Sequence, residues 1–287
     1  MSFEIGFKLT DLNELLSPSD ISWNYDVLFR GIVSLSEGHF WLELNGEIIP
    51  SIYPGKRFIN LEDQTQYGIR TLLVEFMMRL GKISQFIHDP VPQEIIDVVR
   101  SGALGKWRLP TVEITEYGEI KRELWQYKQA LDLSLIWWEE RRFEEDITHQ
   151  NPIDIMLWPL SDTEICLYWC ANRKEDKRDG YVLFEPGNRE IFLEKSAFLL
   201  ALQDFRIQLA AALLLRVDEL KNRSLIDVIV TDNRGAEWFG AENILNELEE
   251  HLLAFDEAVS GSHDRSTDWP ATLAAIRTLK PLIGPLF

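Results

Sequence analysis

The sequence predicts an α+β fold in which two blocks of antiparallel strands pack with long amphipathic helices. Strand patterns occupy residues near 3–53 and 153–193, and helix patterns follow each block. No regular β-α-β alternation appears, so a doubly wound parallel sheet is not expected. Because no low-complexity linker separates the halves, we expect one α+β domain over residues 1–287, or two lobes that meet near residues 110–150.

The first strand block rests on two local signals. Residues 3–9 alternate between apolar and polar side chains, which is typical of a half-buried strand. Within 39–53, Asn45-Gly46 separates two apolar runs, and this dipeptide supplies the two positive φ angles of a type I′ turn. These residues therefore predict a hairpin.

Three helices are expected between the strand blocks. Asp63 and Gln66 have the spacing of a capping box, and apolar side chains then recur at three and four up to Ile87. Asp89-Pro90 predicts the start of a second helix that runs to about Arg100. The third helix, near 119–146, has apolar groups on several sides, so we expect it at the middle of the molecule.

The second block contains expected strands at 153–158, 164–170, 181–185 and 190–193, with a type II turn at 185–188 between the last two. Helices are expected at 196–222, 241–259 and 270–279, and a shorter apolar segment, 224–230, follows the first of them.

The charge of the chain is strongly negative. The net charge is −18, and residues 227–257 hold nine acidic residues against Arg234 alone. Such a field repels nucleic acid and anionic membranes and attracts basic partners. We therefore expect no nucleic-acid or membrane partner, although an acidic surface also serves solubility alone.

The chain is expected to be cytoplasmic. Its first residues lack the basic start and apolar run of a signal peptide. The most apolar stretch, 197–215, is interrupted by polar residues, and a core helix explains it better than a membrane span. Cys166 and Cys170 lie on one expected strand about 13 Å apart, too far for a disulfide.

No catalytic, cofactor-binding or metal-binding motif is found. The glycine-rich phosphate loops, the G-x-S-x-G elbow and the H-E-x-x-H pattern are absent. Glu247 and His251 share one helix face, but two ligands do not make a metal site. The acids at 139–146, around Arg141 and Arg142, are interpreted as a solvated helix end. Enzymatic activity is left open, with the balance against it.

Ten tryptophans are the unusual feature of the composition. Five of them sit inside periodic elements and are interpreted as core residues: Trp41, Trp125, Trp137, Trp138 and Trp169. Trp107, Trp238 and Trp269 lie near element ends and are better candidates for an interface. An aromatic anchor ringed by acids suits a basic partner. The candidate partner-binding residues are Trp238, Glu237, Glu242, Glu247, Glu249, Glu250 and Trp269.

The segments Trp137-Trp138-Glu-Glu-Arg141-Arg142-Phe143 and Asn151 to Trp158, with the early Gly38 to Glu43 hairpin, resemble an uncharacterised bacterial family. The resemblance covers residues from about 1 to 220 and brings no activity with it. A looser class likeness is to bacterial immunity proteins, which are acidic and neutralise a basic toxin by binding it.

Three functions are therefore carried forward. The first is an acidic cytosolic bacterial protein-binding module, in its specific form an immunity-type inhibitor of a basic toxin or effector. The second is an enzyme and the third a small-ligand-binding protein, each with an aromatic or carboxylate pocket that leaves no linear motif. The oligomeric state is not predicted.

Overall fold

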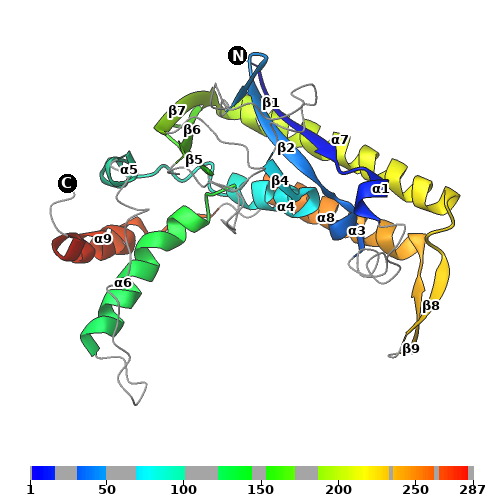
Figure 1. Cartoon of the computed structure of the whole chain (residues 1–287). Coiled ribbons are helices and arrows are strands. Elements are labelled where there is room, and N and C mark those ends of the chain that lie inside the picture. Colours follow the sequence, from blue (N-terminus) through cyan, green and yellow to red (C-terminus); the bar gives the residue numbers. More distant parts are fainter. Residues whose placement is uncertain are drawn as a thin grey trace.

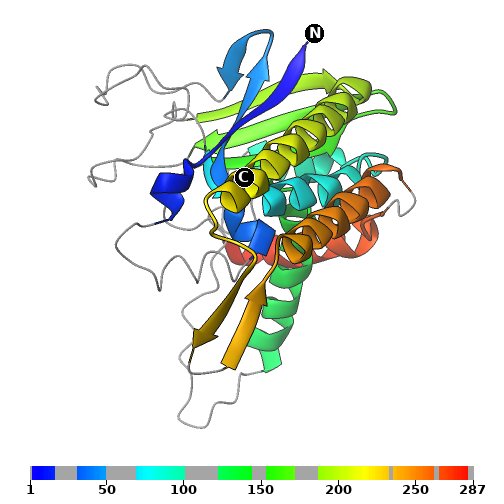
Figure 2. The ribbon, with the colours of Figure 1, turned by 90° about the vertical axis from the view of Figure 1, so that its right-hand side faces the viewer.

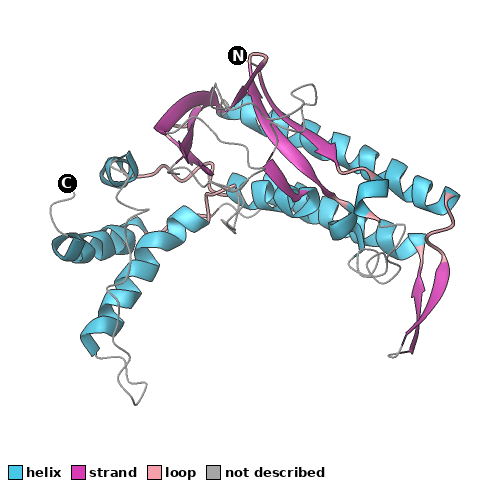
Figure 3. Cartoon of the chain, in the orientation of Figure 1, coloured by secondary structure: helices cyan, strands magenta, loops and turns pink. Residues whose placement is uncertain are grey.

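The computed structural model describes residues 2–16, 31–49, 69–100, 122–143, 153–171, 187–232, 235–261 and 265–283. Helices and strands in these ranges form an α+β structure, as the sequence predicts (Figures 1 and 3). Both antiparallel strand blocks are present. The expected strand at 181–185 and the candidate Trp107 lie outside the described residues.

The first sheet is organised around its long central strand. β2 (Glu37–Leu44) pairs along its whole length with β1 (Phe3–Leu9). Its other edge is shared by β3 (Glu47–Ile49) and β4 (Ile69–Leu72). The predicted hairpin is confirmed, because Asn45 and Gly46 take φ values of 51° and 85° between β2 and β3.

Helices cover one face of this sheet. α7 (Lys195–Asn222) packs against β1, while α4 (Leu73–Ser84) and α8 (Ala241–Val259) pack against each other and against α7. Phe40 of β2 stacks on Phe76 of α4 with ring centroids 3.8 Å apart, and Phe7 meets Phe205 of α7 edge to face at 5.4 Å. The short helices α1 (Leu12–Leu15) and α3 (Gly31–Leu35) complete this first core.

Two of the three strands of the second sheet are buried on both faces. Its strands, β5 (Ile153–Pro159), β6 (Glu164–Ala171) and β7 (Gly187–Glu194), form an antiparallel meander. Because side chains alternate along a strand, Ile155, Leu157, Ile165 and Leu167 enter the first core, whereas their neighbours Met156, Trp158, Cys166 and Tyr168 enter a second. This double burial explains the nearly continuous apolar run of β6.

The second core is closed by three helices. They are α5 (Gln93–Arg100), α6 (Arg122–Glu139) and α9 (Trp269–Ile283), and α6 and α9 pack side by side away from the first sheet (Figure 1). Ion pairs connect α5 to the second sheet and to α9. Arg100 of α5 meets Glu190 of β7 through two hydrogen bonds of 2.5 and 2.8 Å, and Arg277 of α9 meets Glu94 of α5.

Several expected boundaries are wrong. Residues 69–72 pair with β2 as a strand instead of continuing a helix, and the helix that follows ends at Ser84. The helix after Pro90 begins at Gln93, so Asp89 does not cap it. Gly187 and Asn188, expected in a turn, lie in β7. The helix 269–283 passes through Pro281, before which it was expected to end.

The link between α7 and α8 also differs from the expectation. Instead of one apolar segment, it is the hairpin of β8 (Val228–Asp232) and β9 (Gly235–Phe239), which extends beyond the helix ends (Figure 1). The hairpin lets α7 and α8 return antiparallel to each other. Figure 2 shows these two helices lying side by side.

Candidate functional site: a buried charged cluster and an exposed face of two helices

The first candidate is a buried ion pair between two helix ends. Asp89 follows the turn after α4, and Arg141 stands two residues beyond the end of α6. Arg141 Nη2 donates to Asp89 Oδ2 at 2.6 Å, and Arg141 Nη1 donates to the Trp137 carbonyl at 3.1 Å. The Arg141 side chain is fully buried. The interpretation of this segment as a solvated helix end is therefore wrong at Arg141.

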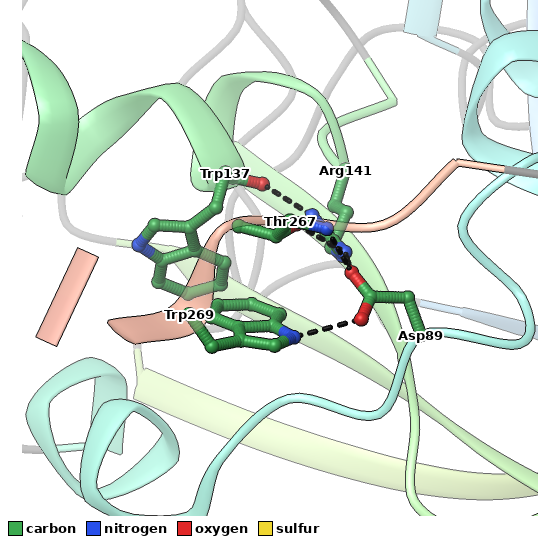
Figure 4. Close-up of polar contacts among 5 residues, drawn as sticks. All are labelled: Asp89, Trp137, Arg141, Thr267 and Trp269. Atoms are coloured by element: carbon green, nitrogen blue, oxygen red, sulfur yellow. Dashed lines mark hydrogen bonds and ion pairs between the residues drawn. The ribbon is translucent and has the colours of Figure 1, made fainter. Parts of the chain in front are cut away.

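The start of α9 and the residues just before it complete the cluster (Figure 4). The Thr267 amide donates to Asp89 Oδ2 at 2.8 Å, and the Trp269 indole Nε1 donates to Asp89 Oδ1 at 2.8 Å. Arg141 Nη2 also donates to Thr267 Oγ1 at 2.9 Å. The Asp89 carboxylate thus receives donors from two parts of the chain that are far in sequence from Asp89 and from each other.

Electrostatics and ring contacts hold the guanidinium in place. Burial lowers the pKa of Arg141 to about 10, and the charge of Asp89 opposes the shift, so Arg141 stays protonated at neutral pH. Its guanidinium carbon lies 4.3 Å from the Phe86 ring centroid and 5.1 Å from that of Trp269. Next to it, burial raises the pKa of Glu140.

This cluster does not have the properties of a reaction site. Both oxygens of the Asp89 carboxylate already accept hydrogen bonds, and Arg141 has no exposed surface that a substrate could reach. A general base needs a free lone pair directed at the substrate. The arrangement instead ties α4, α6 and α9 together.

Other side chains of reactive or metal-binding types also have structural roles. Burial raises the pKa of Cys166 to about 12, which keeps its thiol protonated and unreactive. His251 Nδ1 lies 2.7 Å from the Glu247 carbonyl oxygen, one turn earlier on α8. Within the described part of the chain, no group of three or more His, Cys, Asp or Glu side chains is placed to hold a metal ion.

The partner-binding residues proposed from the sequence are divided among different places. Glu242, Glu249 and Glu250 are exposed on α8. Trp238 and Glu237 are on β9, where the side chains are outside the described structure. The other two candidates have internal roles: Glu247 Oε2 accepts from the Ile32 amide of α3 at 2.9 Å, and Trp269 binds Asp89.

The second candidate is an apolar surface that sequence reasoning missed. On α7, Leu200, Ile207, Leu214 and Leu215 are 59, 58, 47 and 70% exposed, and Leu253 of α8 is 59% exposed. We call these five residues the α7–α8 face. Arg206 Nη2 of α7 meets Asp256 Oδ2 of α8 at 2.5 Å, one turn from Leu253, so the two helices present one surface. The signal in the sequence was the seven-residue spacing of Leu200, Ile207 and Leu214.

By length and composition, α7 is also the one described helix that could cross a membrane, because its most apolar window of 18 residues has a mean hydropathy of 1.6. In the structure its other side is packed. The guanidinium of Arg216 is buried and donates to the carbonyl oxygens of Leu35 and Thr10. A helix held in this way uses its apolar side chains on two opposite sides, one against the protein and one outward.

Comparison with known proteins gives a family but no activity. The family model described as "Family of unknown function (DUF5984)" matches residues 5–275. The chain belongs to the DUF5984 family. Neither the curated proteins nor the solved structures contain a match.

The DUF5984 match confirms the resemblance to an uncharacterised family and extends it past residue 220, where it was expected to end. Two of the segments that suggested the resemblance, 137–143 and 151–158, meet in space. The Arg142–Met156 bridge joins them, and the Phe143 amide donates to the Ile155 carbonyl at 2.9 Å. In this DUF5984 protein, Trp137 and Trp158 both lie in the second core.

Proposed function

We propose that this protein is a binding module for a basic protein partner, and that the partner docks on the α7–α8 face. The observation that carries the proposal is the exposure of several large aliphatic side chains on two adjoining helices. Single exposed apolar residues are normal on a protein surface, whereas a gathered set marks an interaction surface.

The charge around this face indicates the kind of partner. Glu242, Glu249 and Glu250 are exposed along α8, and the whole chain has 47 acidic against 29 basic residues. Acidic surroundings speed the encounter with a basic protein, and this effect weakens as salt is added. An immunity-type inhibitor of a basic effector would use its surface in this way, and inhibition is the specific form of binding that we propose.

The test compares matched variants of the tagged full chain. Ile207→Ser/Leu215→Ser removes apolar surface from the α7–α8 face, while Leu133→Ser/Ile136→Ser does so at similarly exposed positions on α6. Proteins retained from the native cell extract would be quantified at low and high salt, and the retained partner would be purified for calorimetry. Because buried apolar anchors dominate interfaces, we expect the first variant to lose at least about tenfold in affinity.

The α6 variant should bind like the unmodified protein, and the retained partner should be basic and released by salt. Equal retention of the partner by both variants would contradict docking on the α7–α8 face. Activity of the purified partner with and without this protein then decides whether binding is inhibitory.

A further inference from the structure

The outer side of α7 has the periodicity of a helix-pairing seam. Leu200, Ile207 and Leu214 follow one another at seven-residue intervals, and Asp204, Ala211 and Asp218 do the same four residues further on. These are the two positions at which one helix meets another in a coiled coil. All six residues are exposed. We call this set the α7 seam.

The fold does not account for the seam. The core-facing side of α7 lies on the opposite side of the helix and includes Phe198, Phe205, Leu209 and Leu213, all almost fully buried. A helix that packs on one side needs only one apolar stripe. α7 has two, and the second faces solvent.

Within the part of the chain that the structure describes, the two aspartates of the seam carry unpaired charges. Among the described residues, neither Asp204 nor Asp218 forms an ion pair or a hydrogen bond through its carboxylate, whereas the nearby Arg206 is engaged by Asp256. They stand about 21 Å apart along the helix, at 1.5 Å per residue. Covering them without a countercharge would be costly, so the occupant must supply one for each.

We infer that the α7 seam binds an amphipathic α-helix of the partner that carries two lysines or arginines 14 residues apart on its apolar stripe. The inference deepens the proposed function and rests on it, because it specifies which structure of the basic partner docks. Leucine-type side chains of that helix fill the spaces between Leu200, Ile207 and Leu214, and its two basic groups meet Asp204 and Asp218.

A second copy of this chain is a poor occupant. In an antiparallel pair the two kinds of seam position face each other, so Asp204 and Asp218 would lie against Leu214 and Leu200 of the other copy without a countercharge. In a parallel pair each aspartate would face itself. Like charges placed opposite each other across paired helices are destabilising. The net charge of −18 adds to this repulsion and also disfavours an anionic lipid surface.

The test uses three labelled synthetic peptides of 28 residues and measures binding to the full chain by fluorescence anisotropy. All three are amphipathic helices with leucine at seven-residue intervals. The first carries two lysines 14 residues apart on the apolar stripe, the second has glutamates at those positions, and the third places the two lysines on its opposite side. The protein is compared with its Asp204→Lys/Asp218→Lys variant, whose fold is checked by circular dichroism.

We expect the unmodified protein to bind the first peptide at least about tenfold more tightly than the second, because two partly exposed charge pairs together contribute this much. The third peptide has the net charge of the first, and should bind several-fold more weakly than it. The charge-reversed variant should prefer the glutamate peptide. If that variant fails to fold, the three peptides on the unmodified protein decide the matter.

Absence of binding by any peptide, or equal binding by all three, would overturn the inference. So would flotation of the protein with phosphatidylglycerol vesicles, or self-association in sedimentation that Ile207→Ser/Leu215→Ser abolishes. The proposed function is judged separately. If Ile207→Ser/Leu215→Ser loses the natural partner while the peptides show no charge preference, docking on the α7–α8 face is supported. The inference of a helix with two basic residues is then wrong.

Discussion

The Asp89 carboxylate offers the sharpest test of how this protein is held together. Replacing Asp89 with alanine leaves the fully buried Arg141 charge without its countercharge, and it leaves the Thr267 amide and the Trp269 indole without their acceptor. Removing one partner of a buried pair costs about 3–5 kcal/mol. Since whole domains are stable by only about 5–15 kcal/mol, this is a large fraction of the total.

The measurement is urea unfolding followed by circular dichroism and tryptophan fluorescence, because coincident curves justify a single free energy of unfolding. Asp97→Ala is the matched control: Asp97 is exposed on α5 and accepts one hydrogen bond from Gln93, so its loss should cost less than about 0.5 kcal/mol. Asp89→Leu/Arg141→Met should cost less than the sum of the single changes, since no unpaired charge remains. An Asp89→Ala variant within about 1 kcal/mol of the unmodified protein would refute the reasoning.

Three further results are expected. In urea unfolding, Gly31→Ala should cost about 2 kcal/mol and Gly46→Ala about 1 kcal/mol. Both glycines have a positive φ, but only at Gly31 would the added methyl group meet another group, Glu247 Oε2 at 2.0 Å. Equal costs for the two variants would contradict this contact. Because burial raises the pKa of Glu140, its charge destabilises the fold above that pKa, so Glu140→Gln should stabilise by less than about 1 kcal/mol at pH 7 and by nothing at low pH. The Cys166 thiol, whose pKa is raised to about 12, should resist alkylation at pH 8 until the protein is denatured, as mass mapping of its peptide would show.

Local patterns in the sequence predicted the parts of the fold that depend on local chemistry. Asn45-Gly46 specified its turn because only a few residues accept two positive φ angles in succession. Ile69 has the spacing of a helix, yet residues 69–72 form a strand because the free edge of β2 supplies hydrogen-bond partners. Such an edge cannot be seen in a local window of sequence.

The charged cluster was missed for the same reason. Asp89 before proline has the local features of a helix cap, but its partner Arg141 is 52 residues away and Trp269 is 180 residues away. The α7–α8 face was missed for a different reason. Because α7 has apolar residues on both sides, hydrophobicity alone could not show which side faces solvent.

The double burial of the second sheet has a consequence for how the chain holds together. β5 and β6 act as a common wall, since alternate side chains on each strand belong to different cores. Losing the helices on either side would expose a complete face of aliphatic and aromatic groups to water. Neither half can therefore unfold while leaving the other intact, and proteolytic fragments cut between β5 and α7 should aggregate rather than survive as separate folded pieces.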